Sequence, residues 1–240
     1  MMRYFFLVIA LLVNISTIGQ KINGQQLLEK SIAFHDPENN WPSFKGKMLI
    51  EMESPDNGIR RTVIDLNLPA NYFKSTVTKH NYTIESELNK TECTLKLNGS
   101  TSIFPRIKDS LRISCDRAKM MKNYYTYLYG LPMKLKDPGT IIGSKVQKKT
   151  FKGKEYLVLK AGYEKEVGTD TWYFYFDPKT YAMEVYQFFH DESKNDGEYI
   201  LLSDMITVNG IKLPKVRAWY YNKADKYLAT DILQKASSQN

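Results

Sequence analysis

The strongest constraint on the fold comes from residues 171–190, TWYFYFDPKTYAMEVYQFFH, where two aromatic-rich runs flank the tetrapeptide Asp177-Pro178-Lys179-Thr180. Proline presets the backbone for a turn, and an aspartate side chain can accept hydrogen bonds from the backbone that follows it. Aromatic and β-branched residues favour a pleated, half-buried surface. The stretch therefore predicts a β-hairpin.

The loop of this hairpin determines which side chains share a face. A loop with an even number of residues pairs Phe176 with Tyr181, Phe174 with Met183 and Trp172 with Val185. The predicted apolar face then carries Trp172, Phe174, Phe176, Tyr181, Met183 and Val185. The mixed face carries Tyr173, Tyr175, Ala182, Glu184 and Tyr186. Because an apolar face has to be covered, we expect more sheet and two helices around it.

Short strands and turns alternate along much of the remaining chain. Turn signals such as Pro55-Asp56-Asn57-Gly58 and Asn209-Gly210 recur at a spacing of about ten residues, which is typical of an antiparallel meander. The first group of expected strands covers residues 44–53, 59–68, 72–78, 82–88 and 92–97. The second group covers 144–150, 155–162, the two arms of the hairpin, 198–208, 211–221 and 226–233.

Two segments have helical instead of alternating periodicity. In residues 25–35, Leu28, Ile32 and His35 recur at helical spacing before Asp36-Pro37 ends the pattern. Residues 105–130 predict either one long amphipathic helix or two short ones, beginning at Pro105. Its tyrosine cluster, Tyr124, Tyr125, Tyr127 and Tyr129, is typical of a packed seam, with a binding platform as the alternative.

These elements predict a mainly β, α+β fold formed by residues 20–240 as a single domain. A sheet of this size must curl into an unclosed barrel, and the helices would cover its concave side. A curled sheet that its own side chains do not fill leaves a cavity for an apolar ligand. The predicted cavity lining is Trp172, Phe174, Phe176, Met183 and Val185, for which an ordinary packed core is the alternative explanation.

The first 19 residues predict export from the cytoplasm with a cleaved signal peptide, and a transmembrane anchor is the alternative. Arg3 precedes an apolar run, Asn14 interrupts that run, and small residues around Gly19 provide a cleavage site. We therefore expect a periplasmic or cell-envelope protein. In such an oxidising compartment Cys93 and Cys115 could form one disulfide, and two separate buried thiols are the alternative.

The chain has a formal net charge of +8, which is not in itself a nucleic-acid signature. Lysines are dense in residues 145–154, with no acidic residue among them. This segment favours an exposed hairpin whose lysines protect a sheet edge, and peripheral contact with anionic lipid is the alternative. We predict no nucleic-acid partner and a monomeric protein.

No short motif indicates catalysis. The sequence has no Gly-x-Ser-x-Gly elbow and no phosphate-binding glycine loop. The most suggestive polar group is His190-Asp191-Glu192 with Asp196 and Glu198, which is typical of an acidic hairpin loop, with a metal site as the alternative. We predict no catalytic residue, metal or cofactor, and a non-enzymatic protein is favoured.

The order of elements resembles the LolA/LolB-like superfamily of bacterial lipoprotein carriers. Segments 127–140, 170–178, 181–200 and 213–222 also resemble a family of uncharacterised exported proteins from Gram-negative bacteria. The resemblance implies an unclosed barrel with helices over its mouth and carries over no functional residue.

The functional prediction is therefore a non-catalytic envelope protein that binds a lipid or another apolar molecule in the concave face of its sheet. One alternative is a hydrolase or a carbohydrate-binding protein that stacks sugars on Trp219 and Tyr221. Another is a structural interaction module.

Overall fold

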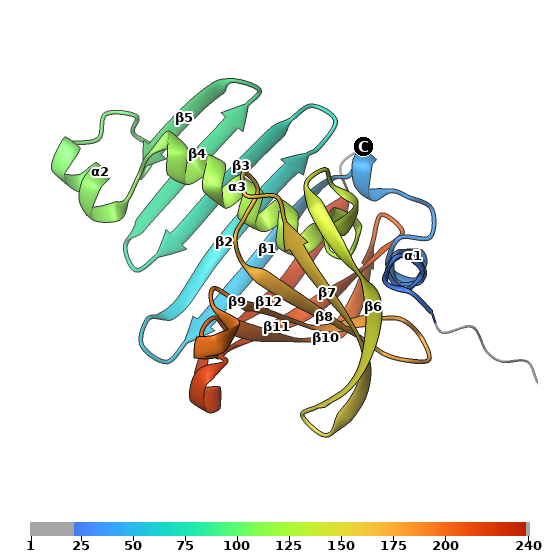
Figure 1. Cartoon of the computed structure of the whole chain (residues 1–240). Coiled ribbons are helices and arrows are strands. Elements are labelled where there is room, and N and C mark those ends of the chain that lie inside the picture. The colour runs from blue at the N-terminus through green and yellow to red at the C-terminus, as the bar shows by residue number, and fades with distance from the viewer. Residues whose placement is uncertain (1–21, 239–240) are drawn as a thin grey trace, which may run out of the picture.

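The structure is a computed structural model that describes residues 22–238 (Figure 1). The predicted signal peptide, residues 1–19, lies outside the described residues. The described strands form one antiparallel sheet of twelve strands in the order β5-β4-β3-β2-β1-β12-β11-β10-β9-β8-β7-β6. Because β5 and β6 remain unpaired edges, the sheet curls without closing, as the sequence predicted.

The strands agree closely with the predicted segments. Their bounds are β1 Lys45–Ser54, β2 Gly58–Asn67, β3 Tyr72–Lys79, β4 Tyr82–Asn89, β5 Glu92–Leu97, β6 Thr140–Phe151, β7 Lys154–Tyr163, β8 Thr171–Phe176, β9 Met183–Phe189, β10 Glu198–Val208, β11 Ile211–Tyr221 and β12 Tyr227–Ser238. The helices are α1 Gly24–His35, α2 Pro105–Leu111 and α3 Cys115–Gly130, with 3-10 turns η1 Trp41–Ser43, η2 Met133–Lys136, η3 Glu192–Lys194 and η4 Lys223–Asp225.

Two meanders meet in the middle of the sheet. Strands β1–β5 form one half and β6–β12 the other, and β1 pairs antiparallel with β12, for example at Ile50 and Leu233. Strands that are consecutive in sequence are therefore neighbours in the sheet, except for β5 and β6, which form its two opposite edges. The junction joins the beginning and the end of the described chain.

The helical segment 105–130 forms two helices. Arg112 ends α2 in the left-handed conformation (φ 53°), and the Ser114 side chain accepts a hydrogen bond from the Arg117 backbone to begin α3. A disulfide joins Cys115, at the start of α3, to Cys93 on the edge strand β5. Figure 1 shows α3 running across the β1–β5 half of the sheet.

The core lies between the concave face of the sheet and the helices. Leu27 and Leu28 of α1 and Leu128 of α3 are buried in one cluster with sheet residues such as Ile64 and Phe174. A smaller cluster on the opposite face contains Tyr156, Val158, Tyr173, Tyr175 and Val185. Within residues 22–238, none of the helices is both long and apolar enough for a membrane crossing.

The central hairpin forms with a different register from the predicted one. Phe176 pairs with Met183 instead of Tyr181, and Tyr175 pairs with Val185 across an irregularity next to Phe176. Phe174 and Trp172 consequently pair with Tyr186 and Phe188. Tyr186 therefore lies on the concave face, and Val185, expected there, lies on the opposite face.

Candidate functional site

A cleft opens between α3 and the end of the sheet near β7 and β8. Its volume is about 620 Å³. One wall comes from α3 (Met120, Asn123, Tyr124, Thr126, Tyr127), and another from the segment that leads into β6 (Lys134, Asp137, Pro138, Thr140). The third comes from the end of β7, the following loop and β8 (Tyr163, Val167, Gly168, Asp170, Trp172). Three segments distant in sequence therefore converge on one space.

Aromatic rings form the apolar wall of this cleft. The Trp172 ring lies 5.5 Å from Tyr127 and 4.8 Å from Phe188, between ring centroids. Phe174 stacks against the inner side of Trp172 at 5.9 Å and is itself fully buried. Trp172 is thus half-buried in the cleft and supported by a packed aromatic core.

The phenols in the cleft are neutral hydrogen-bonding groups. The hydroxyls of Tyr127 and Tyr163 hydrogen-bond to each other. Burial raises the pKa of Tyr163 to about 12 and raises the pKa of Tyr127 well above its ordinary value. Both phenols therefore stay protonated near neutral pH and are poor general bases. These groups suit binding better than acid–base catalysis.

The charged groups of the cleft are paired at its rim. Lys134 forms an ion pair with Asp137. His190 Nδ1 lies 2.8 Å from Asp170 Oδ1, and this hydrogen bond raises the pKa of His190. The rim is therefore polar and wettable, while the wall beneath it is aromatic. Such an arrangement suits an amphiphile whose polar end stays near the solvent.

A buried arginine lies beneath the last turns of α3. Arg217 of β11 is 1 % exposed and donates from Nη1 to the Pro214 carbonyl at 2.9 Å. Its Nη2 lies 3.5 Å from the Leu128 carbonyl of α3, and its guanidinium lies 3.9 Å from the Tyr129 ring centroid. A cation near the end of a helix interacts favourably with the last carbonyls. Arg217 therefore holds the end of α3 on the sheet.

Asp231 of β12 is paired with Arg217 across the strands and is buried beside it. Its Oδ2 accepts a hydrogen bond from Trp219 Nε1 at 3.2 Å. Burial raises the Asp231 pKa, and the nearby Arg60 and Arg217 oppose that rise. Trp219 in turn stacks under Tyr124 of α3 at 6.3 Å. A buried polar cluster thus lies behind Tyr124, and in it Asp231 Oδ1 and Arg217 Nε have no hydrogen-bond partner among the described residues.

The five residues predicted to line a cavity fall into three environments. Trp172 lines the cleft. Phe174, Phe176 and Met183 are at most 1 % exposed and belong to the packed core. Val185 belongs to the cluster on the opposite face of the sheet. Four of the five therefore lie on the concave side of the sheet, and one of these four, Trp172, lines the cleft.

The acidic loop after β9 is held by local contacts. Glu192 accepts a hydrogen bond from the Tyr173 hydroxyl at 2.5 Å and pairs with Lys160 at 2.7 Å. Asp191 caps the short turn η3 through the Ser193 backbone, and Asp196 accepts from the Asp191 backbone at 2.8 Å. No group of three or more His, Cys, Asp or Glu side chains within residues 22–238 could hold a metal ion.

Trp219 and Tyr221, the alternative sugar-stacking pair, do not form one exposed surface. Trp219 is covered by Tyr124, and its indole nitrogen is engaged by Asp231, whereas Tyr221 is 41 % exposed at the end of β11. The sheet carboxylates Glu51 and Glu184 pair with Arg61 and Lys154. Trp219 and Tyr221 therefore do not offer two adjacent exposed rings, and both carboxylates have basic partners.

The dense lysines of residues 145–154 are largely neutralised. Lys154 pairs with Glu184 at 2.6 Å, Lys152 with Asp225 at 2.7 Å, and Lys148 lies 3.9 Å from Glu155. Lys149 lies over the Tyr173 ring. Since Glu184 and Asp225 from outside the hairpin offset the charges of Lys154 and Lys152, the β6–β7 hairpin carries a smaller positive field than its sequence suggests.

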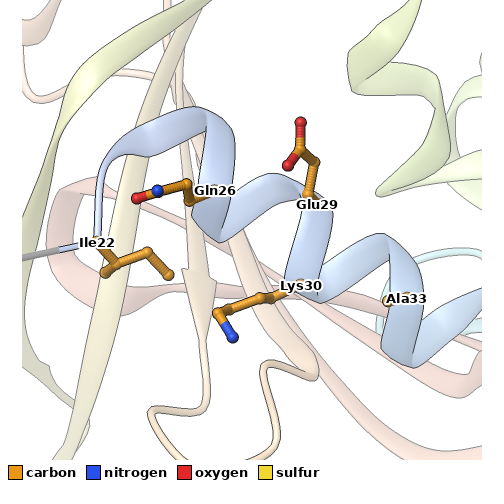
Figure 2. Close-up of a pocket in the computed structure, with 5 residues that line it drawn as sticks. All are labelled: Ile22, Gln26, Glu29, Lys30 and Ala33. Atoms are coloured by element: carbon orange, nitrogen blue, oxygen red, sulfur yellow. The ribbon is translucent and has the colours of Figure 1, made fainter. Parts of the chain in front are cut away.

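A second hollow of about 410 Å³ lies beside the outer side of α1 (Figure 2). Its lining residues, Ile22, Gln26, Glu29, Lys30 and Ala33, all come from residues 22–33. Because a single segment supplies every lining residue, no opposing wall converges on a bound molecule. The cleft at Trp172 is the better candidate site.

Sequence reasoning had singled out only part of this site. The sequence predicts the tyrosines of α3 as a packed seam or a binding platform; Tyr125 is buried in the seam, and Tyr124 and Tyr127 line the cleft. Val167, Gly168 and Asp170 were not noted at all. They lie in an irregular loop without periodicity, so only the three-dimensional structure brings them to α3.

Sequence comparison identifies a family but no activity. Residues 2–235 match the family described as "Family of unknown function (DUF6503)". None of the curated proteins is significantly similar to the chain in sequence.

Two solved structures share the fold. A LolA superfamily protein from Nitrosomonas europaea superposes with a TM-score of 0.50 at 9 % identity, covering 91 % of this chain and 94 % of that one. A putative outer membrane lipoprotein-sorting protein domain from Vibrio parahaemolyticus superposes with a TM-score of 0.53 at 11 % identity, covering 90 % and 92 %. The likeness extends over nearly the whole of each chain and, at this identity, establishes the LolA-like fold alone.

Proposed function

We propose a carrier or binding role for this chain, which belongs to the family of unknown function DUF6503. In this proposal the cleft between α3 and β8 holds the apolar part of a lipid or another amphiphile without chemical conversion. The observation that carries it is the 620 Å³ cleft in which the half-buried Trp172 closes an aromatic wall.

The physical basis of binding is apolar burial. Removing apolar surface from water contributes roughly 25 cal/mol per Å², so an acyl chain needs few specific polar contacts. Trp172 and Tyr127 offer the direct contact surface, and Phe174 beneath them keeps the tryptophan ring in place. The paired charges at the rim leave room for a polar head group in solvent.

We also infer that the protein acts in the periplasm or cell envelope. Residues 1–19 have the sequence pattern of an export signal. The disulfide between Cys93 and Cys115 suits an oxidising compartment. One structural neighbour is named as a putative lipoprotein-sorting protein of the outer membrane. A mature protein recovered from cells with Gln20 as its first residue would support export.

The test uses cis-parinaric acid, a fatty acid whose fluorescence rises in an apolar site, with the delipidated mature protein. We expect saturable binding by the wild-type chain. Gly168 lines the cleft and has no neighbouring atom closer than 3.8 Å to an added Cβ. A Gly168→Phe variant should therefore fill the cleft and weaken binding at least about tenfold, which corresponds to about 1.4 kcal/mol.

A matched control lies at the end of β7, just before the loop that contains Gly168. Gly162 of β7 also has open space around an added Cβ. It lies next to the concave-facing Ala161, so its substituent points to the other face of the sheet. Gly162→Phe should bind the probe as the wild type does. Absence of wild-type binding, or equal binding by Gly168→Phe, would refute the carrier proposal.

A further inference from the structure

The short helix α2 and the residue before it have an apolar side that the rest of residues 22–238 covers only in part. None of its residues is buried. Phe104, immediately before the helix, is 81 % exposed, and Ile107 is 38 % exposed. With Leu111 they recur at positions i, i+3 and i+7, which places them along one side of a helix. An uncovered aromatic ring at this position indicates a contact surface.

The base beneath this surface is firmly attached. The disulfide between Cys93 and Cys115 fixes the start of α3 to β5, and Ile113 is buried directly after α2. Figure 1 shows α2 at the outer end of the molecule, beyond β5 and away from β6–β12. We call residues 104–112 the α2 tip. The tip is thus presented outward from a fixed base.

The α2 tip is basic. It contains Arg106, Lys108 and Arg112 against one acidic residue, Asp109, a balance of three positive to one negative charge. None of these three basic side chains forms an ion pair with another described residue, in contrast to the lysines of the β6–β7 hairpin. Unneutralised positive charge beside exposed apolar side chains is the pattern of segments that rest on anionic membrane surfaces.

We propose that the α2 tip docks on an anionic lipid bilayer, with Phe104 and Ile107 entering the head-group region and Arg106, Lys108 and Arg112 contacting lipid head groups. A stable protein–protein interface buries roughly 800 Å² on each partner. Three apolar side chains on a seven-residue helix fall well short of that area. Interfacial insertion needs only a few such side chains together with attraction of charge.

This inference does not rest on the proposed cleft ligand. Membrane docking requires the tip, and lipid carriage requires the cleft around Trp172. The two surfaces are separate, since no residue of 104–112 lines the cleft. Failure of one proposal is therefore distinguishable from failure of the other, and the Gly168→Phe variant should dock as the wild type does.

The test is co-sedimentation of the mature protein with phosphatidylcholine vesicles in which about one lipid in three is phosphatidylglycerol. We expect the wild type to bind these vesicles, to bind pure phosphatidylcholine weakly and to be released by salt. Arg106→Gln with Lys108→Gln should weaken binding by about twentyfold, and Phe104→Ser should weaken it by about tenfold. Phe104 and Arg106 are exposed and Lys108 is half-buried, and none of the three belongs to the buried core, so thermal unfolding should change little.

The matched control removes two lysines elsewhere. Lys145 and Lys148 are exposed on β6, and Lys145→Gln with Lys148→Gln changes the net charge by the same amount as the tip variant. It should leave vesicle binding nearly intact. Three outcomes would overturn the proposal: no binding to anionic vesicles, tip variants that bind as the wild type does, or greater loss from the β6 variant. A wild-type dimer that Phe104→Ser dissociates, without vesicle binding, would assign the tip to a second copy and also overturn it.

Discussion

At the residue scale, His35 shows how one polar side chain fastens α1 to the sheet. It is fully buried at the end of α1. Its Nδ1 donates to the Lys212 carbonyl at 2.7 Å, and its Nε2 accepts from the Met183 backbone at 2.9 Å. One ring nitrogen donates and the other accepts, so these contacts require the neutral imidazole. From the sequence alone, His35 was predicted only to lie at the end of a helix, without these partners.

The neutral state of His35 predicts a loss of stability in mild acid. Burial lowers its pKa from 6.5 to about 4. The unfolded chain therefore binds the proton more readily, and the stability contributed by neutral His35, present above pH 6.5, is lost as pH falls towards 4. Between pH 7 and pH 5 this linkage should lower the free energy of unfolding by about 2 kcal/mol.

Urea denaturation of the wild type and of His35→Gln at pH 7 and pH 5 checks this expectation. The variant should be less stable at pH 7 and should lose about 2 kcal/mol less on acidification. His190, whose pKa is raised, contributes in the opposite direction and cancels in the difference between the two proteins. His80→Gln, at an exposed turn, is the control. Equal pH dependence of wild type and His35→Gln would contradict the assignment.

At the element scale, the hairpin of β8 and β9 shows where sequence reasoning stops. Alternation predicted both strands, and the Asp177 turn is present, with the Asp177 carboxylate accepting from the Lys179 and Thr180 backbones at 2.9 Å. The register depended on two local events that periodicity does not encode. The loop extends to Met183, and Tyr181 adopts φ 64° within it. The irregularity beside Tyr175 then moves Val185 to the other face.

The cover provided by α3 depends on both of its ends. Arg217 holds its last turn through the Leu128 carbonyl, and the Cys93–Cys115 disulfide fixes its first turn across a sequence separation of 22 residues. Removing that cross-link by Cys93→Ala with Cys115→Ala should lower the free energy of unfolding by about 3 kcal/mol, because the unfolded chain regains the entropy of the open loop.

Urea denaturation of the double alanine variant measures this loss. Amide exchange should quicken in α3 and β5, while β8 and β9, on the far side of the central junction, should keep their protection. The reduced wild type should behave like the variant, which controls for the substitutions themselves. A loss below about 1 kcal/mol would mean that packing alone holds α3 in place.

At the scale of the whole molecule, the sequence predicted the architecture better than the site. Turn signals and two helical segments were sufficient for a curled, unclosed sheet with helices on its concave side, because these patterns are local. The size of the cleft depends on the distance between α3 and the loop that precedes β8. That distance follows from packing across segments separated by dozens of residues, for example Tyr127 against Trp172. The alternation of the hairpin predicted Trp172 on the apolar face, but not its contact with Tyr127.

The last strand holds the two halves of the molecule together. Strand β12 pairs with β1 on one side and β11 on the other, so it is central in the sheet although it is last in sequence. It also contributes Leu233 and Asp231 to the buried concave side. Without it, both central strands would expose unpaired backbone and buried apolar side chains would reach solvent.

A chain that ends at residue 226 should therefore fail to unfold cooperatively, although the eleven other strands and the three α-helices described within residues 22–238 remain. A chain that ends at residue 238 keeps β12 and serves as the control, with the cooperative transition of the full chain. Circular dichroism during a urea titration distinguishes the two. A cooperative transition of full amplitude in the chain ending at 226 would contradict this expectation. It would mean that the two meanders fold independently and that β12 is not required for either of them.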